Sequence, residues 1–244
     1  IGEFKYDTYH GKGKISFKDG SYQEGNFKNG FLNGKGIWSY SDGSFHKGNF
    51  INGVINGEGE YKSSGGDIYV GNFKDGLAHG KGKQTYAEGD TYEGDFLEGE
   101  LTGFGKLSYS NGDSYEGNFI RGLKSGKGTY NWKLRKEKYI GDWKEDLRDG
   151  EGTNSWANGE SYTGQFKSDL YHGKGSYIYN DGASYVGNFF QGQFEGKGVI
   201  TYKNGDRYEG DVQRWVENGI GTMVYGDDTE GWKKYSGEWS EGLE

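Results

Sequence analysis

The stretch YEGDFLEGELTGFGKLSYSNG, residues 92–112, holds the pattern that decides the fold of this chain of 244 residues. Its third residue is the glycine of a Tyr-x-Gly-x-Phe phrase, and the phrase recurs with a period of 23 residues. A fixed period of this length indicates a repeat architecture of about ten units. We call the recurring residues anchor glycines; they are Gly2, Gly25, Gly48, Gly71, Gly94, Gly117, Gly141, Gly164, Gly187, Gly210 and Gly237.

Each repeat contains two short segments with the alternation of a β-strand. In YEGNF, residues 115–119, polar residues alternate with Tyr, Gly and Phe, so these three share one face of a strand. The same parity places Gly, Gly, Leu and Tyr on one face of GFGKLSY, residues 103–109. Turn signals such as Asn111-Gly112 close the units, because glycine readily adopts positive φ. The sequence therefore predicts tandem β-hairpins.

The composition shows how such hairpins could bury apolar surface. Only 31% of the residues are hydrophobic, 17% are aromatic and 49 are Gly. A glycine costs a strand roughly 0.5–1 kcal/mol of backbone entropy, and a ring lying over its bare backbone regains more through burial at ~25 cal/mol per Å². We therefore expect an all-β fold: a single elongated, twisted antiparallel β-meander of tandem hairpins with an aromatic-lined concave face, on the order of 100 Å long.

The repeat resembles a known family. The stretches 92–112 and YEGNFIRGLKSGKG, residues 115–128, are similar to the MORN repeat, and the resemblance covers almost all 244 residues. It implies an elongated antiparallel sheet, often dimeric, in scaffolds that join membranes and cytoskeleton or hold partner proteins in a groove. We expect one continuous MORN-repeat array over 1–244, as a fragment of a longer chain, since residue 1 is not Met.

Some positions depart from the repeat pattern. Gln23 and His46 stand where other repeats have an aromatic ring, which predicts an open or altered groove there. Asp146 and Asp169 replace the glycine five residues after the anchor, and we expect them to keep its turn conformation. The basic segment 132–138 stretches one repeat to 24 residues, and a solvated turn is favoured over a partner contact.

The last repeat departs further. Its spacing grows to 27 residues, Trp215 replaces the same turn glycine, and Trp232 lies in the insertion. We expect these two tryptophans to cap the ribbon, with a partner contact as the alternative.

The residue types argue against catalysis and against several ligands. The chain has no Cys, which excludes a disulfide framework or a Cys-based zinc site. His10 and His79 recur at one repeat position about 30 Å apart, too far to share a metal ion. The segment 125–129 lacks the full spacing of a phosphate-binding loop. We therefore expect no enzyme activity, no cofactor and no metal, and the net charge of −8 counts against nucleic acid.

Tyrosines of the outer rank form the predicted binding groove. Tyrosine is rigid and amphipathic, and the neighbouring acids favour a basic or amphipathic segment of a partner protein. The candidate groove residues are Tyr69, Tyr86, Tyr92, Tyr109, Tyr115, Tyr139, Tyr162, Tyr179, Tyr185, Tyr202 and Tyr208. The structural alternative is that aromatic residues of this kind only pack within the sheet.

The sequence thus predicts a non-enzymatic scaffold or protein-interaction module in the cytoplasm, at the cytoskeleton or at the inner face of a membrane. We expect a homodimer, since open sheet edges need covering, and peripheral membrane association. Two alternatives stay open: an extracellular carbohydrate-binding repeat array, and a regulatory segment of a lipid kinase or lysine methyltransferase.

Overall fold

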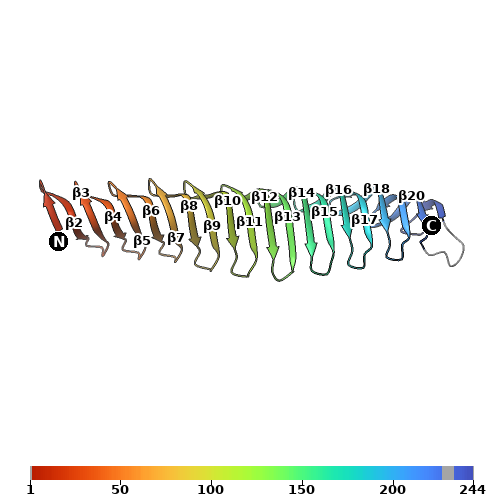
Figure 1. The fold of residues 1–244 in the computed structure, drawn as a ribbon, viewed down its shortest axis with the longest axis horizontal. Helices are drawn as coiled ribbons and strands as arrows, with labels where there is room; N and C mark the ends of the chain where they lie inside the picture. The colour runs from red at the N-terminus through yellow and green to blue at the C-terminus, as the bar shows by residue number, and fades with distance from the viewer. Residues whose placement is uncertain (1, 227–233, 244) are drawn as a thin grey trace. The chain divides into compact units, whose positions relative to one another are not determined.

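The structure is a computed structural model that describes residues 2–226 and 234–243. It divides into two compact units, Ile1–Leu123 and Lys124–Glu244, which we call unit 1 and unit 2. All elements of the described ranges are β-strands (Figure 1). Trp232, one of the two expected capping residues, lies outside the described residues.

Unit 1 is a meander in which each strand pairs antiparallel with the next one in sequence. Its strands are β1 (Gly2–Lys5), β2 (Thr8–Ser16), β3 (Tyr22–Lys28), β4 (Phe31–Ser39), β5 (Phe45–Ile51), β6 (Val54–Lys62), β7 (Ile68–Lys74), β8 (Leu77–Thr85), β9 (Thr91–Leu97), β10 (Glu100–Ser108) and β11 (Ser114–Ile120).

Unit 2 repeats this arrangement with its own antiparallel pairs. Its strands are β12 (Leu123–Trp132), β13 (Glu137–Lys144), β14 (Leu147–Trp156), β15 (Ser161–Lys167), β16 (Leu170–Ile178), β17 (Ser184–Phe190), β18 (Gln193–Thr201), β19 (Arg207–Gln213), β20 (Val216–Val224) and β21 (Lys234–Trp239). Both units confirm the all-β antiparallel meander of tandem hairpins. The continuity of the array over 1–244 stays a prediction.

Two kinds of turn join the strands. The short turn has both central residues at positive φ, for example Glu98 at 52° and Gly99 at 87°, as a type I′ hairpin turn requires. The longer turn carries its glycine at positive φ, as Gly112 at 88° shows and as the Asn-Gly signal predicts. Asp146 at 70° and Asp169 at 69° keep the conformation of the glycines they replace, which confirms that expectation.

The rings lie over glycine backbone, as the composition argument requires. Gly94 of β9 pairs with Gly105 of β10, and Tyr92 pairs with Leu107. A Cβ atom built on Gly105 would lie 2.5 Å from both Cε2 and Cζ of Tyr92, so this ring occupies the space that a side chain would need. The Tyr92 hydroxyl donates a hydrogen bond to the carbonyl oxygen of Asp95 at 3.0 Å, which satisfies its polar end.

These rings contact one another from repeat to repeat. We call the aromatic residues two positions before and two positions after the anchor glycines ladder rings. In unit 1, Tyr92 meets Phe96 and Phe119 edge to face, both at 5.2 Å between ring centroids. In unit 2, Tyr162 meets Phe166 at 5.0 Å and Phe189 at 4.9 Å in the same way. Edge-to-face pairs are a favoured aromatic geometry, so the ladder supplies the core of each unit.

The buried ladder tyrosines predict a loss of stability at alkaline pH. Burial raises the pKa of Tyr92, Tyr185 and Tyr208 from 10.0 to about 12. The folded state therefore keeps these protons when the unfolded state releases them. Stability should fall as pH rises from 10 towards 12, by about 1.4 kcal/mol per pH unit for each group.

Denaturant titrations at increasing pH, combined with tyrosinate absorbance, measure this effect. A Tyr92→Phe variant serves as the control, because it should be less stable at neutral pH through the lost hydrogen bond yet lose less stability on the alkaline side. Gradual ionisation of these hydroxyls near pH 10 in the folded protein would contradict their burial.

Candidate functional site

The structure separates the eleven predicted groove tyrosines into two groups. Seven are ladder rings with at most 3% of their surface exposed: Tyr69, Tyr92, Tyr115, Tyr139, Tyr162, Tyr185 and Tyr208. Their hydroxyls turn back to the backbone, as the 2.9 Å bond from Tyr185 to the carbonyl oxygen of Asn188 shows. This placement differs from the accessible outer rank that was expected, because a ring lying flat over two glycines has no face left for solvent. Partner contact by these seven stays a prediction.

The other four, Tyr86, Tyr109, Tyr179 and Tyr202, stand fifteen residues after an anchor glycine and are half-buried. Beside them lie the residues thirteen after the anchor, as the 4.8 Å between the rings of Tyr177 and Tyr179 shows. We call these two positions together the outer row. Its half-buried aromatic members are Trp38, Tyr40, Tyr61, Tyr86, Tyr109, Tyr130, Trp132, Trp156, Tyr177, Tyr179, Tyr202 and Tyr225.

In unit 1, His46 takes the place of a ladder tyrosine. Its ring stacks on Tyr61 at 4.5 Å, and the Tyr40 hydroxyl lies 3.2 Å from His46 Nδ1. Burial lowers the pKa of His46, which favours the neutral imidazole. The ladder is therefore altered at this repeat, as the sequence predicts, and the imidazole fills the space.

A polar network around Arg148 lies over the ladder rings of unit 2, and the sequence did not predict it. Arg148 Nε donates to Asp169 Oδ1 at 2.9 Å, and Nη1 donates to Asn154 Oδ1 at 3.3 Å. Asn154, which is fully buried, donates to Glu137 Oε1 at 2.9 Å. The guanidinium also lies 5.2 Å from the centre of the Phe166 ring. These groups satisfy one another, so the network positions the strands and their rings.

One contact between adjacent repeats accounts for all three replacements of the turn glycine. The residue seven after one anchor touches the residue five after the next anchor. Lys124 pairs with Asp146 at 3.0 Å, and Arg148 pairs with Asp169 at 2.9 Å. Phe194 packs on Trp215 with 4.4 Å between ring centroids. Each unusual turn residue is thus matched to its neighbour in the preceding repeat.

The outer row of unit 2 joins its neighbours in a wider aromatic surface. Tyr177 lies 6.2 Å from Trp156 and 6.2 Å from Trp215 between ring centroids. Its hydroxyl donates to Glu160 Oε2 at 3.4 Å. We call Trp156, Tyr177, Tyr179, Phe194 and Trp215 the unit 2 aromatic patch. It combines four partly exposed rings and the buried Phe194 with a carboxylate, a combination suited to binding a polypeptide segment.

Many acidic residues of the long turns have a structural role. Asp67 Oδ1 accepts the backbone N–H of Ala87 at 2.9 Å, and Asp90 Oδ1 accepts that of Ser110 at 2.8 Å. Asp206 does the same for Gly226 at 2.7 Å. These carboxylates connect the turns of consecutive repeats. They also leave negative charge along the rim of the outer row.

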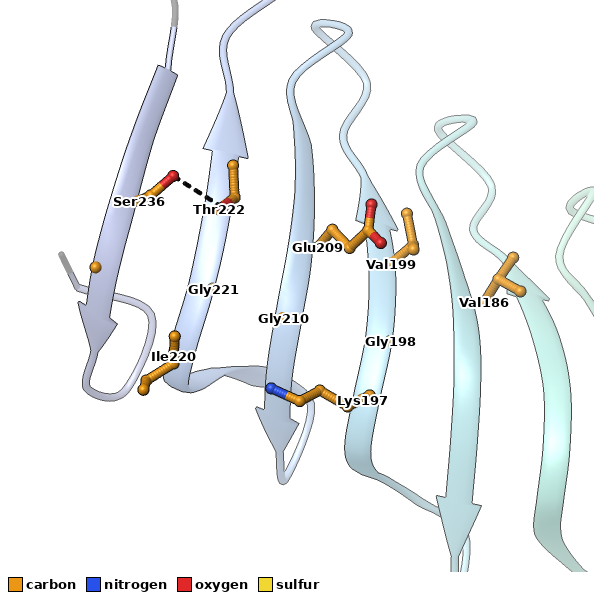
Figure 2. A pocket seen from close by; sticks show the side chains of 11 residues that line it. Val186, Lys197, Gly198, Val199, Glu209, Gly210, Ile220, Gly221, Thr222 and Ser236 are labelled. Atoms are coloured by element: carbon orange, nitrogen blue, oxygen red, sulfur yellow. Dashed lines mark hydrogen bonds between the residues drawn. The ribbon is translucent and has the colours of Figure 1, made fainter.

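A hollow of about 730 Å³ lies on the face of unit 2 opposite the ladder rings (Figure 2). Its floor is the backbone of Gly198, Gly210 and Gly221, with Lys197 and Ile220 on one side. The ammonium of Lys197 already pairs with Asp211 at 2.8 Å. The hollow is shallow and none of the charged groups that line it is buried, so it is the weaker candidate for a binding site.

Two further properties bear on ligands. Within residues 2–226 and 234–243, no group of three or more His, Cys, Asp or Glu side chains is placed to hold a metal ion. The part of the chain that the structure describes has no helix long and apolar enough to cross a membrane.

Comparison with known proteins gives a family match along the chain. The MORN repeat model matches residues 1–22, 24–45, 46–68, 69–91, 92–114, 115–133, 139–161, 162–184, 185–207 and 235–244. No curated protein matches.

Solved structures with some likeness include the TCP10 domain of Danio rerio CPAP, with a TM-score of 0.44 and 11% identity over 83% of this chain and 95% of that chain. The Drosophila melanogaster SAS-4 TCP domain, in complex with a proline-rich motif of Ana2, has a TM-score of 0.41 and 13% identity over 66% of this chain and 84% of that chain.

Proposed function

The chain belongs to the MORN-repeat family, and from this premise we propose that it is a non-enzymatic scaffold that binds a basic or amphipathic segment of a partner protein along the outer row. The repeats themselves support a protein-interaction role. Four finer parts of the proposal rest on the family resemblance: a link between cytoskeleton and membrane, peripheral membrane association, a homodimer and a cytoplasmic location.

The observation that carries the proposal is the difference between the ladder rings and the outer row. Most ladder rings are alike from repeat to repeat and buried, so they build the scaffold. The outer row varies: thirteen residues after the anchor, unit 2 has the half-buried Tyr130 and Tyr177 and the buried Asn154, Ile200 and Met223. Fifteen residues after the anchor, its aromatic rings are all half-buried and so partly accessible. A constant core below a variable, partly exposed surface is how repeat proteins present binding sites.

The charge distribution favours a basic partner. The chain has a net charge of −8, and carboxylates such as Glu160 lie at the rim of the outer row. Complementary charge speeds association and selects among partners. A basic or amphipathic segment could place apolar side chains on the rings and cations against this rim.

Selection of binders from a library of basic and amphipathic peptides tests the proposal. The variant Trp156→Ser with Tyr179→Ser removes two half-buried outer-row rings, and it should weaken a selected peptide by roughly tenfold or more. Tyr115 and Tyr139 are unsuitable for this test, since both are fully buried and their loss would disturb the core.

The matched control changes the opposite face. Val186→Ser with Ile220→Ser alters residues that are 54% and 65% exposed there, and binding should stay within about twofold of the unchanged protein. Equal loss in both variants, or selected peptides with no basic residues, would contradict an outer-row site for basic segments. Circular dichroism of each variant separates a binding defect from unfolding.

A further inference from the structure

A hollow of about 290 Å³ lies at the unit 2 aromatic patch. Its walls include the rings of Tyr179, Phe194, Tyr202 and Trp215, together with the side chains of Ile200 and Asp181. The four rings come from three successive repeats. A pocket of this size fits one side-chain head group rather than a whole ligand.

Trp215 makes the pocket specific to this repeat. It has φ of 75°, a conformation in which most other repeats have glycine. A bulky residue with positive φ is uncommon and costs backbone energy. Its ring is held by Phe194 at 4.4 Å and is still 39% exposed, so it forms an open wall of the hollow.

The electrostatic environment of the pocket is negative. Asp181 is the charged residue among those that line it, and Glu160 lies nearby through its contact with Tyr177. Burial raises the pKa of Tyr179, and the negative charges of Glu160 and Asp181 raise it further. The neighbouring hollow shares Asp181 with this pocket and also carries Lys203 and Asp206, so two carboxylates face one ammonium there.

We propose that this hollow is an anchor pocket for the guanidinium group of an arginine in the partner segment, an inference that rests on the proposed function and specifies its partner. A guanidinium is planar, is weakly hydrated and stacks on aromatic rings. It can also donate two hydrogen bonds to one carboxylate, which Asp181 supplies. The partly exposed rings of Tyr179, Tyr202 and Trp215, backed by the buried Phe194, and the one carboxylate together match this group.

Other occupants fit the pocket less well. A lysine ammonium is a compact, strongly hydrated charge that gains less from flat ring surfaces. An apolar side chain would remove water from Asp181 without giving it a partner. Titration with butylammonium and with the neutral butylurea distinguishes these occupants from a guanidinium.

The test uses small probes and the whole chain. Butylguanidinium, butylammonium and the neutral butylurea are titrated separately, and amide NMR signals of residues 179–183 and 214–215 are followed. We expect butylguanidinium to bind about tenfold more tightly than butylurea, and more tightly than butylammonium. Asp181→Asn should remove this preference while it keeps the side-chain oxygen that accepts the backbone N–H of Ala183 at 3.0 Å.

Asp42→Asn is the matched control. Asp42 occupies the same turn position in unit 1 and accepts the N–H of Ser44 at 2.9 Å, but it does not line this hollow. It should leave the butylguanidinium titration unchanged. Trp215→Gly restores the usual turn residue and should weaken butylguanidinium binding although the fold is kept.

The outcomes distinguish this inference from the proposed function. Equal binding of butylguanidinium and butylurea, stronger binding of butylammonium, or no effect of Asp181→Asn would overturn the arginine pocket. Each of these results would leave the peptide selection, with its outer-row and opposite-face variants, to decide separately whether the array binds basic segments.

Discussion

Replacing Gly105 with alanine is expected to lower the free energy of unfolding by about 3 kcal/mol, although it adds a single methyl group. The new Cβ would lie 2.5 Å from two carbon atoms of the Tyr92 ring, and Tyr92 is fully buried. The ring would have to leave its place over β9 and β10 and lose its contacts with Phe96 and Phe119. Urea denaturation followed by circular dichroism measures the change.

Two further variants show whether the ring is the cause. Gly99→Ala adds a methyl group where no atom lies within 4 Å, at φ of 87°, so its cost should be near the left-handed backbone penalty of about 1 kcal/mol. In the background of Tyr92→Ala, the further loss from Gly105→Ala should be much smaller, because the two changes share one contact. Similar losses for Gly105→Ala and Gly99→Ala would contradict the packing of rings over glycine.

Much of the fold follows from the sequence, because the 23-residue period and the two-residue alternation within strands pick out the same residues. The period locates each hairpin, and alternation places Tyr92, Gly94 and Phe96 on one face. Alternation does not tell whether a tyrosine hydroxyl points out to a partner or back to the backbone. The volume argument that places phenylalanine rings over glycine applies equally to the tyrosines, and it would have indicated that Tyr69 and its equivalents are buried.

The lateral contacts were harder to predict, because their members are about 21 residues apart and no single repeat contains both. A signal is nevertheless present within the chain. The three replacements of the turn glycine, Asp146, Asp169 and Trp215, each follow an unusual residue in the preceding repeat, namely Lys124, Arg148 and Phe194 respectively. The two acidic turn residues each follow a basic residue of the preceding repeat, and the aromatic turn residue follows an aromatic residue. Chemical matching between adjacent repeats is therefore the feature to examine in such arrays.

Breaking the pair of Arg148 and Asp169 should cost about 2 kcal/mol of unfolding free energy in Asp169→Ala, because the side chain of Asp169 is 41% exposed and water screens part of the interaction. The guanidinium would lose Nε–H···Oδ1 bonding at 2.9 Å, and the backbone N–H of Arg148 would lose its 3.0 Å bond to the same oxygen. The side chain of Arg148 is only 18% exposed, so water can replace these partners only in part. Denaturant unfolding followed by tryptophan fluorescence measures the loss.

The double variant Arg148→Leu with Asp169→Gly should recover part of this stability, because unit 1 already contains the same pairing of an apolar residue with a turn glycine. Leu32 is fully buried at the equivalent position, and Gly53 occupies the matching turn, where its N–H donates to the carbonyl oxygen of Leu32 at 2.8 Å. A buried ion pair replaced by a well-packed apolar side chain is often neutral in stability. Arg148→Leu also removes the donor to the buried Asn154 Oδ1 at 3.3 Å and the cation 3.9 Å from Glu137 Oε1, so the recovery is expected to be incomplete. If the double variant were as unstable as Asp169→Ala, the Arg148 network would be essential to the packing of unit 2 and would not be interchangeable with the apolar solution of unit 1.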